Sequence, residues 1–335
     1  MTPQAPWPVY NGSNEPHDGI DRLPAPPPWR DFDGGPPLPA PRAAAADSPD
    51  RAHRARAYRP TEQSVALVNA ALFLRRPLLV TGPPGSGKSS LPYAVARELR
   101  LGPVLRWNVT SRSALADGLY RYDPLSRLYA AGHQPEDSAI EDHLRLGPLG
   151  TALLPYERPR VLLIDEIDKS DLDLPNDLLN VLEEGQYEIP ELVRAARTRP
   201  EAAVMVADSD DRVPVRHGRV RCRAFPFVVL TSNGEREFPP AFLRRCVTLE
   251  LRRPLPGHLE EIVRAHLGEL DDHDRELVAA FLRRGTAGEL ATDQLLNAIY
   301  LTRASGLDAG SRDELAEALM PYLSRAAGAW DGDDL

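Results

Sequence analysis

Lysine is almost absent from this sequence. The chain has 335 residues and 40 basic side chains, but only Lys88 and Lys169 are lysines and all the others are arginines. Arginine offers a planar fork of donors, whereas lysine offers a compact ammonium group on a flexible stem. A lysine kept in such a chain marks a place where a point charge is required. We single out Lys88 on this ground, while chance retention explains Lys169 equally well.

Cysteine is scarce too. The two thiols, Cys222 and Cys246, are far apart and form no CxxC pair, and the eight histidines show no HExxH-type spacing. Disulfides are rare in cytosolic proteins, so we expect two reduced thiols. The absence of metal-ligand spacing also argues against a structural metal site built from these residue types.

Long apolar runs and an excess of positive charge are also missing. No run approaches the roughly 18 apolar residues that a membrane-spanning helix needs. Residues 1–8 have neither the basic start nor the apolar stretch of a signal peptide. We therefore expect a cytoplasmic protein that does not bind membranes. The net charge of −9 disfavours nucleic acid as a partner, because dedicated nucleic-acid-binding proteins usually carry a basic excess.

Proline divides the chain. Residues 1–59 hold 13 of the 34 prolines and show no apolar periodicity, which predicts a disordered or extended, proline-rich arm. From 60 to 254, short apolar runs alternate with helical patterns, which predicts an α/β domain with a parallel sheet and helices on both faces. The expected strands lie at 78–80, 104–109, 161–164, 227–230 and 247–251.

The C-terminal part contains helical patterns only. We expect a small helical lid domain over residues 255–330, because no further strand pattern follows about residue 254. Its expected helices lie near 258–270, 274–284, 293–304 and 312–325.

One segment matches a phosphate-binding pattern in full. Residues 82–89 read Gly-Pro-Pro-Gly-Ser-Gly-Lys-Ser, between an expected strand and an expected helix. Its glycines let backbone N–H groups face phosphate oxygens, and the next helix directs its positive N-terminus at the same anion. Lys88 can then reach the β- and γ-phosphates, and the Ser89 hydroxyl can ligate Mg²⁺. We assign nucleotide binding to Gly82, Pro83, Pro84, Gly85, Ser86, Gly87, Lys88, Ser89 and Ser90.

Two carboxylates follow the apolar run 161–164. Ligands bind at the carboxyl ends of parallel strands, so Asp165 is expected to meet Mg²⁺ through its water shell and Glu166 to polarise the attacking water. The alternative is an acidic pair that merely caps the next helix. Capping of the helix after Ser170 is instead expected from Asp168, Asp171 and Asp173.

Three further residues are candidates for catalysis. Asn233 ends the strand expected at 227–230, where its amide can hydrogen-bond the γ-phosphate or orient water; an ordinary asparagine turn is the alternative. Arg244 and Arg245 follow a short proline-rich segment, and an arginine supplied across a subunit interface can stabilise a transferring phosphoryl group. The alternative for this pair is an ordinary surface position.

Together these residues resemble the AAA+ superfamily, and within it the MoxR-like, dynein-related ATPases, over residues 60–325. The resemblance implies a P-loop NTPase core that binds ATP and Mg²⁺. It places Walker A at 82–89, Walker B at Asp165 and Glu166, and sensor 1 at Asn233. It assigns an arginine finger to the Arg244–Arg245 pair, with Arg245 preferred. It also implies inserts within 120–146 and 185–226.

One departure concerns sensor 2, which such proteins often provide as an arginine at the start of a lid helix. Here residues 291–296 read Ala-Thr-Asp-Gln-Leu-Leu, and Arg303 lies too far along the helix to be a good substitute.

The resemblance implies a ring-forming ATPase, such as a hexamer, that remodels or assembles a protein partner. A von Willebrand factor A-type protein is one kind of partner that it suggests. Two alternatives remain: a signalling switch of a bacterial conflict system with little turnover, and a DNA-associated motor or loader. Glu166 and the finger candidate disfavour the switch, and the negative net charge disfavours the motor.

Overall fold

A computed structural model describes residues 7–39, 48–133, 139–207, 209–285 and 291–305, together with single positions 311, 315 and 319. The chain forms two compact units. The first contains Met1–Ala55, Pro60–Thr81 and Ser89–Glu250, and the second contains Arg56–Arg59, Gly82–Lys88 and Leu251–Leu335. The C-terminal segment of the second unit begins at Leu251, close to the expected lid boundary at 255. The second unit also includes the phosphate loop and a short linker.

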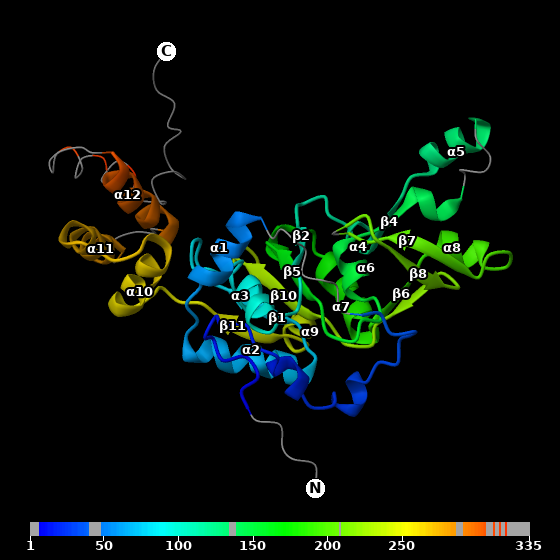
Figure 1. The fold of residues 1–335 in the computed structure, drawn as a ribbon, viewed down its shortest axis with the longest axis horizontal. Helices are drawn as coiled ribbons and strands as arrows, with labels where there is room; N and C mark the ends of the chain where they lie inside the picture. The colour runs from blue at the N-terminus through cyan, green and yellow to red at the C-terminus, as the bar shows by residue number, and fades with distance from the viewer. Residues whose placement is uncertain are drawn as a thin grey trace, which may run out of the picture. The chain divides into compact units, whose positions relative to one another are not determined.

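A five-stranded parallel sheet lies at the centre of the first unit (Figure 1). Its order is β11-β1-β10-β5-β2, with bounds Val247–Glu250, Leu78–Thr81, Phe227–Ser232, Val161–Asp165 and Leu105–Asn108. Strands β5 and β10 are buried at every position, as strands covered on both sheet faces are. The predicted α/β class and all five predicted strands are confirmed.

Helices of the first unit pack against this sheet. Helix α2 (Glu62–Leu74) contacts β1 and β11, whereas α3 (Leu91–Glu98) contacts β5. Thr61 caps α2, because the backbone N–H of Ser64 donates to its hydroxyl oxygen at 3.1 Å. The other helices are α1 (Pro49–Ala57), α4 (Leu115–Leu119), α6 (Pro148–Ala152), α7 (Leu174–Glu184) and α9 (Pro240–Leu243).

A second sheet occupies the two inserts and was not predicted. Its order is β3-β4-β7-β8-β9-β6, with bounds Tyr120–Tyr122, Leu144–Leu146, Glu201–Met205, Arg212–Arg216, Arg219–Arg221 and Gln186–Glu188. Most of these strands have three residues, and charged side chains alternate with the buried ones, as in Arg-Val-Arg of β9. Such short segments give too few repeats of a two-residue period to be recognised from the sequence.

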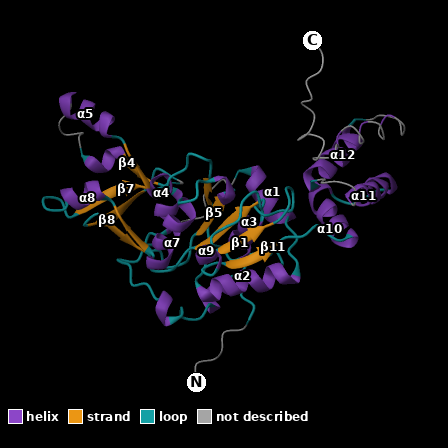
Figure 2. Ribbon diagram, turned by 180° about the vertical axis from the view of Figure 1, so that it is seen from behind, coloured by secondary structure: helices purple, strands orange, loops and turns teal. Residues whose placement is uncertain are grey.

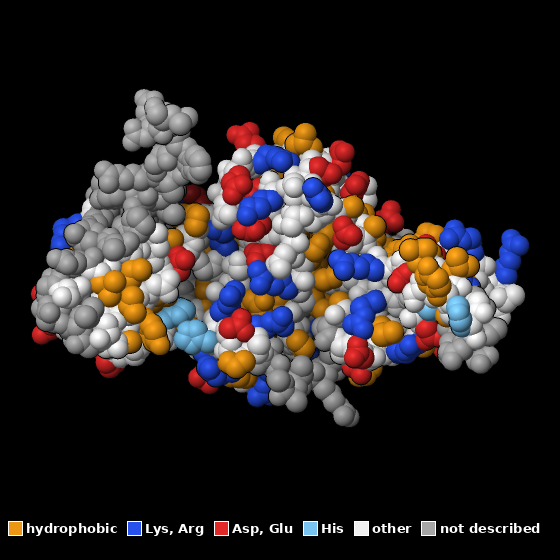
Figure 3. Space-filling view, turned by 90° about the horizontal axis from the view of Figure 1, so that it is seen from above, with side chains coloured by type: hydrophobic (Ala, Val, Ile, Leu, Met, Phe, Trp, Pro, Cys, Tyr) orange, Lys and Arg blue, Asp and Glu red, His pale blue; other side chains and the backbone are white. Residues whose placement is uncertain are grey.

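Two short helices accompany this second sheet (Figure 2). They are α5 (Pro124–His133) and α8 (Pro190–Ala195). Helix α5 exposes Leu125, Leu128 and Tyr129, and apolar side chains gather at the end of the molecule where this helix lies (Figure 3). Elsewhere on that face, basic and acidic side chains are interspersed.

The second unit has a helical core of its own. It contains α10 (Pro256–Leu267), α11 (Asp272–Gly285) and α12 (Thr292–Ala304), close to three predicted helices. Their buried side chains include Leu259, Val263, Leu277, Phe281, Leu295 and Ile299. The fourth predicted helix, at 312–325, lies largely outside the described residues. In the part of the chain that the structure describes, no helix is long and apolar enough to cross a membrane.

Residues 7–39, which we call the N-terminal strap, form a mostly irregular segment with two short 3-10 helices, Gly19–Arg22 and Pro28–Arg30. Of the two forms expected for the arm over 1–59, the disordered one is wrong for these residues. The strap buries Val9, Tyr10 and Ile20 against the first unit. Residues 48–59 are also described, largely as α1, while 1–6 and 40–47 lie outside the described residues. The strap is held by hydrogen bonds to groups of the core and not by a long helix or strand. Its sequence therefore needs no apolar periodicity.

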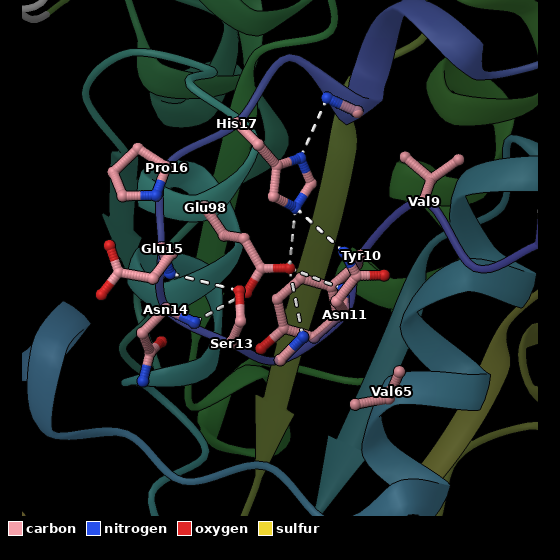
Figure 4. Close-up of polar contacts among 12 residues, drawn as sticks. Val9, Tyr10, Asn11, Ser13, Asn14, Glu15, Pro16, His17, Val65 and Glu98 are labelled. Atoms are coloured by element: carbon pink, nitrogen blue, oxygen red, sulfur yellow. Dashed lines mark hydrogen bonds and ion pairs between the residues drawn. The ribbon is translucent and has the colours of Figure 1, made fainter.

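A buried carboxylate forms the first anchor of the strap (Figure 4). Glu98, at the end of α3, is 0% exposed. It accepts hydrogen bonds from the backbone N–H groups of Asn11, Gly12 and Asn14 at 2.6, 3.1 and 2.9 Å. The Nε2 atom of His17 lies 3.3 Å from the same carboxylate. Burial of this charge is therefore balanced by several donors from one loop of the strap.

Asn69 of α2 provides a second anchor. Its side-chain oxygen accepts from the backbone N–H groups of Val9 and Tyr10 at 2.7 and 2.9 Å, and its amide nitrogen donates to the Tyr10 carbonyl at 2.7 Å. The Asn69 side chain thus bonds to the N–H and C=O groups of the strap that a neighbouring β-strand would otherwise pair with. The start of the strap is thereby fixed beside α2.

Arg30 is the third anchor, and its guanidinium is buried. It donates to the carbonyls of Leu182 and Glu183 at the end of α7, at 3.1 and 3.2 Å. It also donates to the carbonyl of Arg75, just after α2, at 2.7 Å. The Phe225 ring lies 4.5 Å from the guanidinium carbon, within cation–π range. Burial lowers the pKa of Arg30, but arginine stays protonated in proteins.

We predict that Glu98→Ala lowers the free energy of unfolding by about 3 kcal/mol or more, because hydrogen bonds to a charged group contribute roughly 1.5–3 kcal/mol and the orphaned N–H groups stay buried. Chemical denaturation would measure the loss. Glu184→Ala is the matched control, since Glu184 is exposed at the end of α7, and should change stability by less than about 0.5 kcal/mol. Equal effects of the two substitutions would contradict the anchor role of Glu98.

Candidate functional site

The segment Gly82–Lys88 needs its glycines. Gly82, Gly85 and Gly87 have φ values of +150°, +73° and +86°, which side chains rarely adopt. Space is also limiting, since a Cβ on Gly85 would lie 2.8 Å from the backbone nitrogen of Thr292, in the same unit. The loop therefore takes a conformation that only this glycine pattern permits.

Lys88 is buried within this loop. Its ammonium donates to the carbonyls of Gly82 and Pro83, both at 2.8 Å. The hydroxyl of Ser86 is buried and has no hydrogen-bond partner among the described residues. A buried hydroxyl without a partner is costly in a finished fold. A phosphate-bearing ligand in the loop would supply the missing partner, so these residues fit a nucleotide.

Asp165 is the centre of the second part of the candidate site. One carboxylate oxygen accepts from the hydroxyls of Ser89 and Thr231, both at 2.7 Å, and the other accepts from Arg106 Nη2 at 2.7 Å. Burial by itself would raise the pKa of this carboxyl. The hydrogen bonds from Thr231, Ser89 and Arg106 outweigh burial and leave the pKa of Asp165 below its usual value. Asp165 is therefore ionised at neutral pH.

The sheet explains why these groups meet. Strands β10 and β5 pair in parallel with Leu230 opposite Ile164. The next residues, Thr231 and Asp165, therefore lie side by side near the carboxyl ends of these strands. Ser89 follows β1 at the same edge, since Thr81 pairs with Ser232 of β10. Sequence reasoning found Ser89 and Asp165 but missed Thr231 and Arg106. Their place in the site could be recognised only from the register of β10 and β2 against β5, because Thr231 continues an apolar run and Arg106 lies on an edge strand.

Glu166 has an unusual backbone. Its φ of +61° and ψ of 48° are left-handed, which is uncommon outside glycine and often marks a functional position. Its N–H donates to the Thr231 hydroxyl at 2.9 Å, which holds the turn. Its half-exposed side chain forms an ion pair with Lys169 at 2.9 Å. The hydrogen bond to Glu166 raises the pKa of Lys169, so this second lysine has a local partner.

Asp168 does not cap a helix, contrary to the sequence-based prediction. Its buried carboxylate accepts from the backbone N–H groups of Asn233 and Glu235 at 2.9 and 3.1 Å. It thereby positions the turn after β10 that carries Asn233. Asp171 behaves as predicted, because it accepts from the N–H groups of Asp173 and Leu174 at the start of α7.

Asp173 occupies the N-cap position of α7 but makes no side-chain cap hydrogen bond. Its predicted capping role is therefore wrong, and Asp171 takes that role instead.

Arg244 and Arg245 lie at the end of α9, on the surface. Arg244 donates to the Pro240 carbonyl and Arg245 to the Ala241 carbonyl, at 3.3 and 3.2 Å. Arg245 Nε also lies 3.7 Å from Glu183 at the end of α7. These contacts are to their own helix and its neighbour, not to Asp165.

Arg303 is committed to the second unit. Its guanidinium pairs with the fully buried carboxylate of Asp274 and donates to the carbonyls of Leu267 and Glu269. It thus ties α12 to the loop between α10 and α11. This agrees with the expectation that Arg303 is a poor substitute for sensor 2.

No group of three or more His, Cys, Asp and Glu side chains suited to a metal ion occurs among the described residues. Mg²⁺ keeps much of its water shell and is bound in proteins by one or two side-chain oxygens together with phosphates. The Ser89 hydroxyl and the Asp165 carboxylate are the oxygens that this part of the chain offers.

The family model described as "AAA domain (dynein-related subfamily)" matches residues 77–246, which is half of the chain. The chain belongs to this family. The resemblance to dynein-related AAA+ ATPases is thus confirmed. The match begins just before β1 and ends at Cys246, so it includes every site residue that we named from the sequence. No curated protein matches this chain.

One similar solved structure is that of NtrX from Brucella abortus in complex with ADP. It is 15% identical, has a TM-score of 0.40, and the match covers 82% of this chain. The chain spans about half (55%) of the length of that protein. Similarity at this level does not bear on what this chain does.

Proposed function

We propose that this AAA+ family member is a MoxR-like ATPase that binds and hydrolyses ATP with Mg²⁺, acts as a ring, and uses turnover to remodel or assemble a protein partner. The observation that carries the proposal is the 2.7 Å hydrogen bond between Ser89 and Asp165. It joins the residue after the phosphate-loop lysine to the carboxylate at the end of β5. A metal bound to a nucleotide requires these two oxygens at one place.

The phosphate loop has the parts needed to hold the triphosphate. Its glycines open the backbone, and Lys88 brings one ammonium group to the segment. A phosphate would replace the Gly82 and Pro83 carbonyls as partner of that ammonium and provide an acceptor for Ser86. Charge-assisted hydrogen bonds of this kind are about twice as strong as neutral ones.

Mg²⁺ would be held by the Ser89 hydroxyl and, through water, by Asp165. When bound, it would neutralise charge that builds up on the phosphoryl oxygens. The low pKa of Asp165 keeps this carboxylate ionised and ready for a cation.

Glu166 is the proposed general base. It follows β5 directly with a left-handed backbone, and its side chain is half-exposed. The Lys169 ammonium lies 2.9 Å from this carboxylate, and a positioned carboxylate can accept a proton from water. Asn233 is positioned by Asp168 and is the proposed γ-phosphate sensor.

The proposed arginine finger is Arg245. Its half-exposed guanidinium contacts the Ala241 carbonyl and the Glu183 carboxylate. An exposed guanidinium of this kind can be offered to a nucleotide in an adjacent subunit. Guanidinium forks match phosphoryl oxygens, which is why arginine serves in this role. A ring of identical subunits would place this residue at each interface.

We predict that Lys88→Ala abolishes tight ATP binding, because the loop loses its only ammonium group. Isothermal titration calorimetry of the purified proteins would test it. Lys169→Ala is a matched control, since it removes the only other lysine of the chain, and it should still bind ATP. Unchanged ATP affinity in Lys88→Ala would overturn the assignment of the site.

For Glu166→Gln we expect ATP binding to persist while hydrolysis falls by roughly 10²–10⁴-fold, the typical contribution of a positioned general base. Glutamine keeps the shape of the side chain but cannot accept the proton. A phosphate-release assay with saturating ATP would measure the loss, and turnover near the wild-type rate would rule out this base. The same variant, used as bait, would retain the protein partner, with a von Willebrand factor A-type protein as the expected class.

Mixing two inactive variants tests the ring. Lys88→Ala lacks a working pocket and Arg245→Ala lacks the finger, so mixed assemblies should regain part of the ATPase activity at interfaces that combine an intact arginine with an intact pocket. Finger arginines contribute roughly 10³–10⁵-fold in rate in other P-loop enzymes. Normal turnover by Arg245→Ala alone, or activity per subunit that stays constant down to a proven monomer, would contradict action between subunits. If Arg244→Ala were the inactive variant instead, the finger would be Arg244.

A further inference from the structure

Asp165 has a partner that the proposed ATPase mechanism does not use. Arg106, on β2, places its Nη2 atom 2.7 Å from the Asp165 oxygen that Ser89 and Thr231 leave unoccupied. We propose that Arg106 is an internal counter-ion of Asp165 that competes with Mg²⁺ for this carboxylate when the metal enters with the nucleotide. Arg106 would then set how strongly nucleotide binding depends on the metal. This inference rests on the proposed nucleotide site.

The need for such a counter-ion follows from burial. The side chain of Asp165 is 8% exposed, and a carboxylate in such surroundings is costly unless a cation or several donors compensate it. Ser89 and Thr231 are neutral donors, and both use the same oxygen. Among the described residues, Arg106 is the one cation recorded within ion-pair distance of Asp165. Without metal, the Arg106 guanidinium is the cation that compensates the negative charge of Asp165.

The position of Arg106 also allows it to leave. Strand β2 is at the edge of the sheet and alternates buried and exposed positions, with Arg106 at an exposed one. Its side chain is 36% exposed, so it can turn into water without opening the core. Because arginine does not lose its proton, the guanidinium keeps its charge, and a competing cation is needed to take its place beside the carboxylate. A divalent cation beside Asp165 repels this guanidinium and supplies the force.

The direction of the effect follows from these contacts. Nucleotide without metal can bind while the Arg106–Asp165 pair stays intact, whereas Mg²⁺ that enters with the nucleotide competes with Arg106 for the Asp165 carboxylate. Removal of the guanidinium should therefore increase the ratio of the metal-free to the Mg²⁺-containing dissociation constant. We expect an increase of about tenfold, which corresponds to roughly 1.4 kcal/mol. Without nucleotide and metal, the same variant should melt at a lower temperature, because Asp165 is left buried and unpaired.

The experiment measures binding, not turnover. Calorimetry with a non-hydrolysable ATP analogue, in EDTA and in saturating Mg²⁺, would give the ratio for the wild-type protein, Arg106→Gln and Arg106→Lys. Arg112→Gln is the matched control, because it removes the same charge from an exposed position just beyond β2. Arg106→Gln should raise the ratio about tenfold relative to Arg112→Gln. Arg106→Lys keeps the charge but loses the fork, so its ratio should be intermediate.

Equal ratios in Arg106→Gln, Arg106→Lys and Arg112→Gln would overturn the proposal. If Arg106→Gln does not fold, the ratio of Arg106→Lys decides alone, and a wild-type value then counts against the counter-ion role. Failure of the proposed function would look different, since the wild-type protein would then bind the analogue neither with nor without Mg²⁺. An analogue that binds the wild-type protein more tightly with Mg²⁺, with no change in Arg106→Gln, would disprove only the role of Arg106.

Discussion

The Asp165 carboxylate is ionised although it lies in a sheet whose strands are largely apolar. The polar groups around it are hydrogen-bond donors that stabilise its negative charge. Ser89 comes from the end of the phosphate loop, Thr231 from β10 and Arg106 from β2. Thr231 also accepts from the N–H of Glu166, so the same hydroxyl holds the turn of the proposed base. Order at this edge of the sheet thus depends on one carboxylate with three donors.

Local patterns carried most of what could be predicted. The phosphate loop, the run before Asp165 and the cap at Thr61 are each encoded within a few neighbouring residues, and their structures follow from backbone chemistry close by. Thr231 and Arg106 could not be found in this way, because their roles depend on which strand lies beside β5. Asp168 was assigned to the wrong element for the same reason, since its partners lie 65 and 67 residues further along the chain.

The second sheet and the strap were missed on different physical grounds. The insert strands are short and have charged residues at alternate positions, so their hydrophobic signal is weak. The strap is rich in proline and looks disordered by composition, yet its amides are satisfied by Glu98 and Asn69 and its Arg30 by backbone carbonyls. Composition describes what a segment can do alone and does not include what a distant side chain offers it.

Glu183 links two parts of the molecule that sequence analysis treated as unrelated. One of its oxygens lies 3.4 Å from the buried Arg30 of the strap, and the other lies 3.7 Å from Arg245. The Arg30 contact is anchored in the interior, whereas the Arg245 contact is exposed and weak. Glu183 therefore offers one carboxylate to both the buried guanidinium of Arg30 and the exposed guanidinium of Arg245.

The anchors of the strap also impose an order on folding during protein synthesis. Val9 needs Asn69, Asn11 needs Glu98 and Arg30 needs the carbonyl of Leu182, which lie 60, 87 and 152 residues further along the chain. At translation rates of about 5–20 residues per second, the last of these partners leaves the ribosome on the order of ten seconds after the strap has emerged. The strap, although made earlier, can be completed only after the core that it encloses. During that interval its apolar residues are exposed, and its many prolines, which disfavour β-aggregation, suit a segment that must wait.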